Sequence, residues 1–542
     1  MPELTGGEAV VGSLKQHEVD TLFGVPGIQL DHLFNALHDE RNALRVIQTR
    51  HEQGAAYMAY GYAASTGKPG VCVVVPGPGL LNATAAISTA YACNAPMLCV
   101  VGQIPSGAIG KGFGLLHEIP DQLALIRGLT KYAERADTLS EVPEVMRGAF
   151  EALYNGRPRP VEIEVPMDIL AARGALELGA PGAASLGPAL DADALESAAK
   201  LLGAAERPLI MVGGGIWGAE PALAALAEML QAPVVMSRNA LGALDDRHYL
   251  AQKYPVGHRL WADADVVLAV GTRLNPALPG WGTDEALKIV RIDIDPEEIG
   301  RAGSPDVAIL GDAAGALAEL VERTGAHNRA RSSREAELIA LKQGFIDELH
   351  QNLGPQMAYL DVLRAGLPDD GIFVEELTQV GYVARFGFPV YHPRSYIGSG
   401  YQGTLGFGFA TALGVKVGNP DRPVLSISGD GGFMYNVQEL STAVQQGIDL
   451  VAVVFSDGAF GNVQRMQVED YGGKVIATDL HNPDFVTLAE SFGAQGLRAN
   501  SLSELGRALE TGFATPGPTL IDVPIGNTPA PWAYLNLPKA RG

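Results

Sequence analysis

The chain has 542 residues, of which 47% are hydrophobic and 18% are charged, and its formal net charge is −22. This length predicts two to four domains, and the hydrophobic content is ample for large cores. The negative charge argues against nucleic acids and anionic membranes as partners, although it leaves room for a local site that binds a phosphorylated cofactor.

The three cysteines, Cys72, Cys93 and Cys99, lie in apolar segments without CxxC spacing. They predict buried thiols in a reducing compartment and no disulfide framework. The N-terminal segment MPELTGGEAV lacks the features of a signal peptide, and no apolar run is long enough to predict a membrane span. We therefore expect a cytoplasmic protein.

Residues 1–170 alternate between predicted strands and helices. Apolar strands are expected over residues 21–24, 44–48, 70–75 and 96–101, with helices over residues 5–16, 51–64 and 80–91. This alternation predicts a parallel sheet with helices on both faces, which we assign to a first domain.

A segment rich in Gly, Ala and Pro, residues 171–189, is predicted to be a linker. Residues 190–325 predict a second Rossmann-like sheet. Its GGGIWGA turn lacks the GxGxxG spacing of dinucleotide sites, so it is a weak signal. Arg273 and Asp293 in this domain either contact a nucleotide or cap strand ends.

A charged, helical connection over residues 326–354 leads to a third domain, residues 355–535. A strand over residues 424–428 ends in the turn Gly429-Asp430-Gly431-Gly432. After a helix-like segment, a strand over residues 450–455 ends in Ser456-Asp457-Gly458. Parallel strands place both acidic groups at one sheet edge, where carboxylates and close backbone suit Mg²⁺ and a diphosphate. The alternative is a pair of tight turns without a ligand.

The stretch GDGGFMYNVQELSTAVQQGIDLVAVVFSDGAFGN resembles the thiamine diphosphate signature, in which GDG is followed by Asn-Asn or Asn-Asp. The resemblance implies that Asp430, Asp457 and the carbonyl of Ala459 hold Mg²⁺. It also implies cofactor contacts from Gly429, Gly431, Gly432, Phe460 and Gly461. Ser456-Asp457 departs from the usual Asn-Asn, and we expect the metal to be retained with changed affinity.

In the first domain, RHEQGAAYMAYGYA, a PGPG turn and GLLNATAAISTAY resemble the pyrimidine-binding domain of acetolactate synthase-like enzymes. The resemblance implies that Glu52 hydrogen-bonds the aminopyrimidine and promotes its imino tautomer. That role requires a carboxyl in a fairly apolar pocket. Pro26, Gly77 and Asn82 would line the cofactor cleft. The alternative for Glu52 is a surface position favoured by the helix dipole.

Two further residues stand where this family contacts its substrate. Gln29 follows the first strand in FGVPGIQ and could donate to a substrate carbonyl or carboxylate. His117, in GFGLLHEIPDQ, stands where acetolactate synthases usually have glutamine. The alternative for His117 is a purely structural role.

The stretch YIGSGYQGTLGFGFATALG resembles the GTMGFG segment of the family, whose bulky apolar residue bends the cofactor. Leu405 takes that place, with Gly403 and Gln379 as further cofactor contacts. The tail PAPWAYLNLPKARG either closes over the site or is disordered.

The fold expected is therefore α/β, with three doubly wound parallel-sheet domains: pyrimidine-binding, central Rossmann-like and diphosphate-binding. The resemblance implies a thiamine diphosphate- and Mg²⁺-dependent enzyme that decarboxylates a 2-keto acid and ligates the enamine to a second carbonyl. Val463 stands where pyruvate decarboxylase-type enzymes carry an acid, and no His-His pair is present, which favours ligation.

Alternatives are a non-oxidative decarboxylase, a 2-hydroxyketone lyase, a flavin-dependent 2-keto acid oxidase and a non-catalytic homologue. FAD is conceivable in the central domain but not favoured. In the family the site lies between two subunits, so Glu52 and Asp430 would come from different chains of a dimer or a dimer of dimers.

Overall fold

The chain is described here from a computed structural model, which describes residues 1–184 and 187–542. It divides into two compact units, each made of several segments of the chain. The first unit comprises Met1–Ser185, Val374–Leu377 and Ser399–Ile525, and the second comprises Leu186–Phe373, Thr378–Gly398 and Gly526–Gly542.

The N-terminal part of the first unit is a six-stranded parallel sheet in the order β3-β2-β4-β5-β7-β6. Its strands are β2 (Thr21–Gly24), β3 (Arg45–Gln48), β4 (Gly70–Val74), β5 (Met97–Gln103), β6 (Tyr132–Arg135) and β7 (Val161–Pro166). Its main helices are α1 (Gly6–Gln16), α2 (Asp31–Asp39), α3 (Glu52–Thr66), α4 (Pro78–Cys93), α5 (Gln122–Arg127), α6 (Val142–Tyr154) and α7 (Met167–Ala171). The predicted alternation of strands and helices is confirmed.

Alternation along the central strands explains why both faces of this sheet are covered. Val71, Val73, Leu98 and Val100 point into the core that α1, α2 and α6 close. Helices α3 and α4 pack against each other and against β4. Helix α3 also packs against α16 (Gly408–Gly418), which ties this part of the first unit to its C-terminal part.

The third sheet has the order β16-β15-β17-β18-β20-β19. Its strands are β15 (Ile372–Glu375), β16 (Tyr396–Ile397), β17 (Val424–Gly429), β18 (Val451–Ser456), β19 (Gln495–Arg498) and β20 (Thr519–Pro524). Strands β17 and β18 are parallel neighbours, as the two acidic turns predicted. The single helix-like segment expected between them is instead two helices, α17 (Asp430–Phe433) and α18 (Glu439–Gln446). Helices α19 (Gly461–Glu469), α20 (Phe485–Phe492) and α21 (Leu502–Ala514) follow.

The second unit contains a parallel sheet in the order β11-β10-β9-β12-β13-β14. Its strands are β9 (Pro208–Val212), β10 (Val234–Met236), β11 (Ala251–Gln252), β12 (Val266–Val270), β13 (Lys288–Asp293) and β14 (Val307–Leu310). Helices α8 (Ala192–Ala204), α9 (Glu220–Leu230), α10 (Tyr254–Asp263), α11 (Pro296–Arg301) and α12 (Ala313–Gly325) accompany it. Helices α13 (Glu335–Asn352), α14 (Gly354–Gly366) and α15 (Gln379–Gly387) belong to the same unit.

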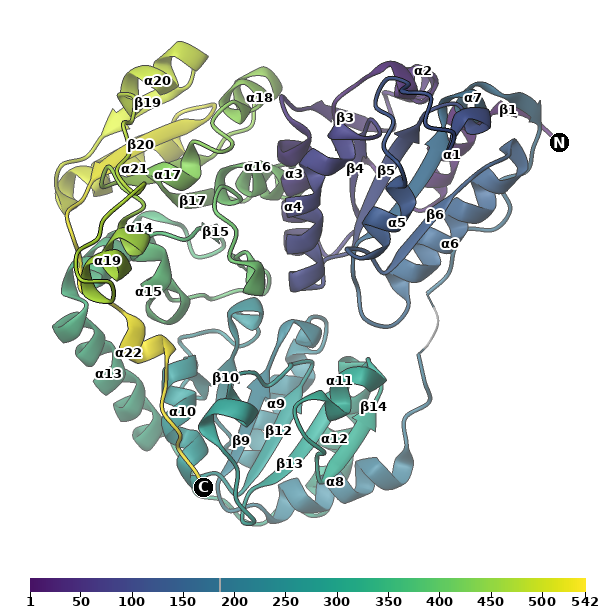
Figure 1. The fold of residues 1–542 in the computed structure, drawn as a ribbon. Helices are drawn as coiled ribbons and strands as arrows, with labels where there is room; N and C mark the ends of the chain where they lie inside the picture. The colour runs from purple at the N-terminus through teal and green to yellow at the C-terminus, as the bar shows by residue number, and fades with distance from the viewer. Residues whose placement is uncertain (185–186) are drawn as a thin grey trace. The chain divides into compact units, whose positions relative to one another are not determined.

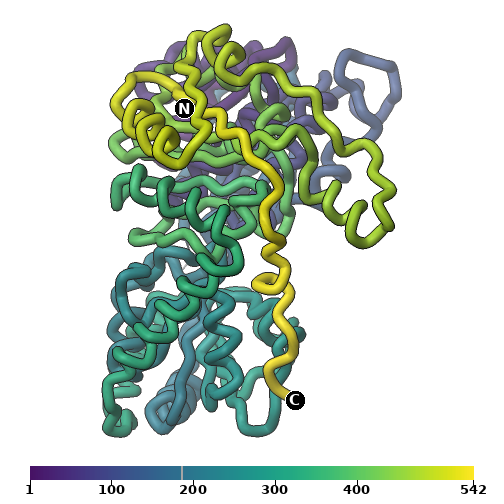
Figure 2. The backbone as a smooth tube through the Cα atoms, turned by 90° about the vertical axis from the view of Figure 1, so that its left-hand side faces the viewer, coloured from purple at the N-terminus to yellow at the C-terminus, as the bar shows by residue number. Residues whose placement is uncertain are grey.

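The C-terminal segment lies along elements of the second unit (Figures 1 and 2). Tyr534 of α22 (Trp532–Leu535) accepts a hydrogen bond from Asn352 at 2.8 Å. Arg541 donates to the carbonyl of Trp261 at 2.7 Å and pairs with Asp284 at 2.8 Å. These contacts order the tail within the second unit, which contradicts the alternative of a disordered terminus, and closure over the site stays a prediction.

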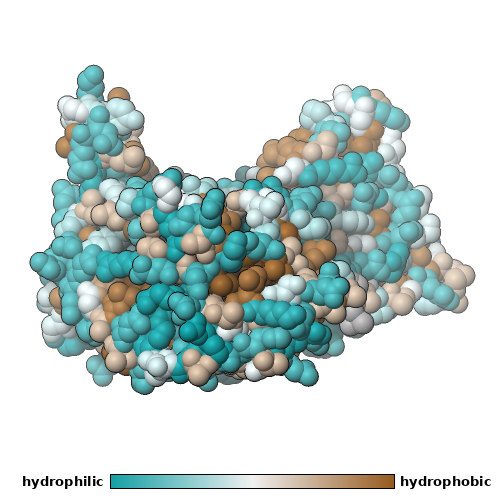
Figure 3. Space-filling model, turned by 90° about the horizontal axis from the view of Figure 1, so that it is seen from below, coloured by the Kyte–Doolittle hydropathy of each residue, from teal (hydrophilic) through white to brown (hydrophobic). Residues whose placement is uncertain are grey.

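The segment predicted as a linker, residues 171–189, begins in regular structure. Strand β8 (Arg173–Ala175) pairs antiparallel with β1 (Glu3–Thr5). Residues 185 and 186 of the predicted linker lie outside the described residues. The face in Figure 3 is mostly hydrophilic, with some hydrophobic patches. Among the described residues, no helix is both long and apolar enough to cross a membrane.

Candidate active site

Gln29 and His117 are brought together beyond the carboxyl ends of the N-terminal sheet. Gln29 is buried on a short 3₁₀ helix (Ile28–Leu30) after β2 and donates to the carbonyl of Leu116 at 3.0 Å. The Nδ1 of His117 lies 3.1 Å from Oε1 of Gln29. An amide oxygen can only accept, so Nδ1 carries the proton and a neutral His117 ring presents Nε2 as an acceptor.

Glu52 and Asn82 form the second pair at this edge. Glu52 is the first residue of α3, whose N-cap is His51, and Asn82 lies in the first turns of α4. The side-chain amide of Asn82 donates to Oε2 of Glu52 at 3.0 Å. The buried residues that follow in α3 are mostly Ala, Tyr and Met, whereas Glu52 itself is half-buried in this single chain.

The backbone of the PGPG turn, residues 76–79, is hydrogen-bonded to the buried side chain of Gln122. The amide of Gly77 donates to Oε1 of Gln122 at 2.8 Å, and Gln122 in turn donates to Glu164 at 3.1 Å. The sequence reading did not single out Gln122 or Glu164, because their separation along the chain hides this contact. Pro26 lies exposed in the turn after β2.

Asp430 is the centre of the C-terminal half of the site and is only 1% exposed. Its Oδ2 accepts hydrogen bonds from the Gly458 amide and from the side chain of Asn482, both at 2.7 Å. Its Oδ1 accepts from the Gly431 amide at 2.8 Å. Each carboxylate oxygen has two lone pairs, so Oδ1 retains capacity for a cation.

The donor atoms gathered here fit a hard cation. Asp430 follows β17, and Asp457 follows β18 with its Oδ1 3.3 Å from the Ala459 amide. Among the described residues, no group of three His, Cys, Asp or Glu side chains could hold a metal. Carboxylates together with backbone, water and phosphate oxygens would suit Mg²⁺, and the carbonyl of Ala459 as a further ligand stays a prediction.

Asn482 is a site residue that the sequence reading missed. It lies in the loop before α20, and residues 478–480 of this loop pair with residues 458–460. The Phe460 amide donates to the carbonyl of Thr478 at 2.8 Å, and the Leu480 amide donates to that of Gly458 at 2.7 Å. Only the fold brings this loop to Asp430, because no motif marks it.

The unusual Ser456 has its own partner in the sheet. Its hydroxyl donates to Oδ1 of Asp522 at 2.6 Å, and Asp522, on β20, also accepts from Arg498 at 3.0 Å. Serine therefore links the end of β18 to β20, and the role of Asp457 toward a metal stays a prediction.

Glu376, a second missed residue, connects the two glycine-rich segments. It follows β15, is fully buried, and accepts from the amides of Gly406 and Gly408 and from the Ser428 hydroxyl. A Cβ atom on Gly432 would lie 2.1 Å from its Oε1, so glycine is required there. Glu376 thus holds the Leu405 loop through hydrogen bonds and packs closely against the GDGG turn.

Comparison with known proteins identifies the family. Residues 4–125, 195–320 and 378–523 match the models of the thiamine pyrophosphate enzyme N-terminal TPP binding domain, central domain and C-terminal TPP binding domain. The chain belongs to the thiamine pyrophosphate enzyme family. It is therefore an enzyme that uses thiamine pyrophosphate, which is another name for thiamine diphosphate, for carboligase or carboxy-lyase chemistry.

Curated relatives of this thiamine pyrophosphate enzyme match it over nearly its whole length. The probable 2-ketoarginine decarboxylase AruI of Pseudomonas aeruginosa is 37% identical, over 96% of this chain and 94% of its own. The probable acetolactate synthase large subunit of Methanocaldococcus jannaschii is 35% identical, over 96% and 92%. The acetolactate synthase isozyme 1 large subunit of Escherichia coli is 32% identical, over 96% and 94%.

Other predicted contacts of this thiamine pyrophosphate enzyme lie in the second unit. The amide oxygen of Gln379 accepts from the backbone and hydroxyl of Thr528, at 3.1 and 2.6 Å. Asp293 accepts from the Asp295 amide at 3.0 Å, as expected for a residue that caps a strand end. The role of Gln379 toward the cofactor and the binding of FAD stay predictions.

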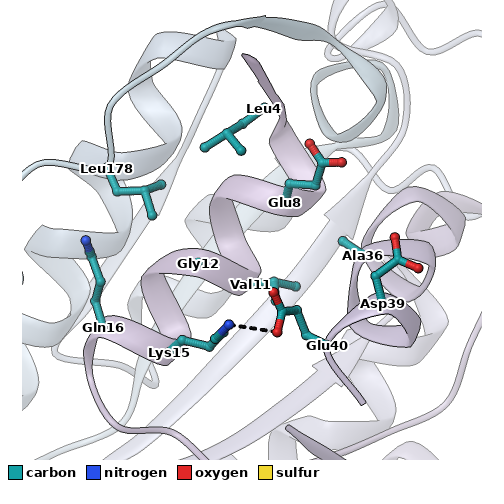
Figure 4. Close-up of a pocket in the computed structure, with 10 residues that line it drawn as sticks. All are labelled: Leu4, Glu8, Val11, Gly12, Lys15, Gln16, Ala36, Asp39, Glu40 and Leu178. Carbon is teal, nitrogen blue, oxygen red and sulfur yellow. Dashed lines mark hydrogen bonds and ion pairs between the residues drawn. The ribbon is translucent and has the colours of Figure 1, made fainter. Parts of the chain in front are cut away.

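The pocket in Figure 4 lies within the N-terminal domain, and none of the predicted site residues lines it. It measures about 590 Å³ and is lined by residues of α1, α2 and the segment after β8. Leu178 packs there close to Gly12, and Lys15 pairs with Glu40 at 2.7 Å.

Burial raises the pKa of Glu376 to about 7, which gives a testable pH dependence. In the unfolded chain this carboxyl ionises near 4.5, so between pH 4.5 and 7 the folded protein holds the additional proton. Its contribution to stability is therefore lost as the pH rises through this window. Relative to Glu376→Gln, the cofactor-free wild type should lose on the order of 3 kcal/mol of unfolding free energy between pH 5 and 7.5. Urea unfolding of both proteins across this pH range measures the loss. A difference in unfolding free energy between the two proteins that does not change with pH would contradict the raised pKa of Glu376.

Proposed function

We propose that the enzyme requires Mg²⁺, decarboxylates a 2-keto acid and joins the remaining acyl unit to a second carbonyl compound. Our choice of ligation over release of a free aldehyde rests on Val463, in the first turn of α19. Valine cannot donate a proton to the reacting carbon, so release of a free aldehyde lacks the acid that pyruvate decarboxylase-type enzymes use. The acetolactate synthases among the relatives support the same choice.

The cofactor site would draw on both halves of the first unit. Asp430, Asp457 and the carbonyl of Ala459 would hold Mg²⁺. The backbone of Gly429, Gly431, Gly432, Phe460 and Gly461 would lie against the diphosphate, and Leu405 and Gly403 against the rings. When bound, thiamine diphosphate supplies the electron sink for loss of CO₂.

The side chains of the N-terminal half would then manage protons and orientation. Glu52 would share a proton with the aminopyrimidine ring nitrogen. Asn82 would fix the orientation of the Glu52 carboxyl by donating a hydrogen bond to Oε2. One amide hydrogen of Gln29 binds the carbonyl of Leu116, and the second is available to a substrate carboxylate. His117 adds a hydrogen-bond acceptor, Nε2, beside Gln29.

We also propose that the active form is a homodimer or a dimer of dimers, with Glu52 and Asp430 of each site from different chains. Exposed apolar side chains beside both halves support a partner surface. Those beside the first half are Ile28, Leu81, Phe113 and Leu116, and those beside the second are Met434, Tyr435, Val463 and Met466.

A second candidate is a non-oxidative 2-keto acid decarboxylase. The 37% identity to a probable 2-ketoarginine decarboxylase favours it. In that case water in the closed site must deliver the proton that Val463 cannot.

Product analysis distinguishes the two candidates. The enzyme is incubated with thiamine diphosphate, Mg²⁺ and either pyruvate or 2-ketoarginine, with and without benzaldehyde as acceptor. Acetolactate or a mixed hydroxyketone is the expected product. A free aldehyde as the sole product would overturn the ligase proposal in favour of the decarboxylase. The absence of any cofactor-dependent product from a panel of 2-keto acids would contradict both candidate functions. The Glu52→Gln variant, whose turnover should be strongly reduced, serves as the control.

A further inference from the structure

Glu439, at the start of α18, is fully buried, yet its carboxylate binds a segment almost 400 positions earlier in the chain. The amide of Arg50 donates to both carboxylate oxygens at 3.2 Å, and the amide of His51 donates to Oε1 at 3.1 Å. The Thr442 hydroxyl, one turn further along α18, donates to Oε2 at 2.6 Å. A buried carboxylate is thus satisfied mainly by two backbone amides of another part of the first unit.

These two amides directly precede Glu52. His51 is the N-cap of α3 and Glu52 is its first residue, so Glu439 holds the point at which this helix begins. Further contacts along α18 reinforce the attachment. The Arg50 guanidinium donates to the side chain of Gln445 at 3.3 Å, and the Arg45 guanidinium to the carbonyl of Gln446 at 3.4 Å. A negative charge at a helix N-terminus is also favoured by the helix dipole.

Gly54 shows how closely the carboxylate approaches the first turn of α3. A Cβ atom added to Gly54 would lie 2.4 Å from Oε1 of Glu439. Alanine is a better helix former than glycine in a helix interior. Glycine at this position is therefore explained by the space that Glu439 occupies.

Helix α18 is also joined to the predicted metal turn, residues 429–432. It follows α17, which begins at Asp430, and the Glu439 amide donates to the carbonyl of Asn436 at 3.0 Å. Asn436 is fully buried and donates to the carbonyl of Gly406, next to the Leu405 loop. One short segment therefore connects Asp430, the Leu405 loop and the start of the Glu52 helix.

We propose that Glu439 is a positioning residue that orients Glu52 by fixing the first turn of α3. This inference rests on the proposed function, in which Glu52 serves a cofactor held by the partner chain. The segment from Asp430 to Glu439 then links the metal turn of one active site to the glutamate that the same chain provides to the other.

The first test measures backbone protection without cofactor. Amide hydrogen exchange of the peptide that covers residues 45–56 is compared among wild type, Glu439→Gln and Gly54→Ala. Both variants should raise its exchange rate about tenfold, since the carboxylate no longer binds two amides. Thr442→Val, which removes one donor to Oε2, should have a smaller effect. Glu490→Gln, the same change at an exposed carboxylate of α20, is the matched control.

The second test follows exchange of the cofactor C2 proton for deuterium, by NMR after acid quench. Glu439→Gln and Gly54→Ala should slow this exchange and kcat roughly 10–100-fold, because a small displacement of a positioned group has large effects. The KM and the affinity for thiamine diphosphate should change less than about threefold, because Asp430 and its turn keep their contacts. The double variant should be no slower than the single ones, since both disturb one contact.

The outcomes separate this inference from the proposed function. Wild-type rates of both kinds of exchange in Glu439→Gln and Gly54→Ala, with Glu52→Gln inactive, would overturn the role of Glu439 alone. Loss of cofactor affinity equal to the loss of rate would also overturn it, because the residue would then support the diphosphate half. If Glu52→Gln itself exchanged C2 normally, the proposed role of Glu52 would be wrong. Should Glu439→Gln not fold, Gly54→Ala and Thr442→Val carry the test.

Discussion

Glu52→Gln is expected to lower kcat by about 10²–10⁴-fold, the usual contribution of a general acid or base, while cofactor affinity stays within about threefold. Glutamine has nearly the size of glutamate, and its carbonyl oxygen can still accept from Asn82, which now donates to Oε2 at 3.0 Å. The variant loses only the ability to share a proton with the aminopyrimidine. Steady-state kinetics and titration with thiamine diphosphate measure the two quantities.

Asn82→Ala tests the orientation of Glu52 separately from its ability to share a proton. It leaves the carboxyl of Glu52 in place and removes the donor that orients it, so its loss of kcat should be smaller. Full turnover in Glu52→Gln would refute the assignment. Equal losses in both variants would show that orientation, and not proton sharing, is what Glu52 contributes.

Asp430→Ala is expected to abolish Mg²⁺-dependent binding of thiamine diphosphate. Asp430 supplies the buried carboxylate of the predicted metal set, and its removal also leaves the amides of Gly431 and Gly458 without their acceptor. The unfolding free energy of the cofactor-free protein should fall by about 1–3 kcal/mol, the cost of unsatisfied buried donors. Calorimetric titration and urea unfolding measure the two effects.

Asn482→Ala separates metal binding from folding in this experiment. It keeps the carboxylate of Asp430 and removes one of the groups that orient it, so metal affinity should fall about 10–100-fold without being lost. Unchanged cofactor binding in Asp430→Ala would contradict the metal assignment.

Mixing the two inactive variants tests the shared site. If Glu52 and Asp430 of one site come from different chains, a mixed dimer of Glu52→Gln and Asp430→Ala chains holds one intact site and one doubly altered site. Random reassociation should restore roughly a quarter of wild-type activity, since half of the dimers are mixed. Activity that stays at the level of the separate variants would indicate that each site is built from one chain.

Local patterns in the sequence were sufficient for the fold class and for much of the candidate site. Strands of consecutive apolar residues that alternate with helices predict buried parallel sheets, and the observed β2, β4, β17 and β18 lie within a residue or two of the expected ranges. The placement of Asp430 and Asp457 side by side followed from one βαβ unit, because neighbouring parallel strands end at the same edge. The boundaries of the helices were harder to predict from the sequence, as the unexpected break between α17 and α18 shows.

Only the tertiary structure revealed Glu376, Glu439, Gln122 and Asn482. Each acts on backbone or carboxylate groups far away in the chain: Glu376 on the Gly406 loop, Glu439 on the start of α3, and Asn482 on Asp430. Such partners have no fixed spacing, so no periodicity or motif identifies them.

The sequence by itself thus determined the fold class and predicted which groups can do chemistry, because residue type and local turn geometry are encoded within a few positions. The tertiary structure decided which groups hold them in place, because burial removes water as a competing partner and makes long-range hydrogen bonds obligatory.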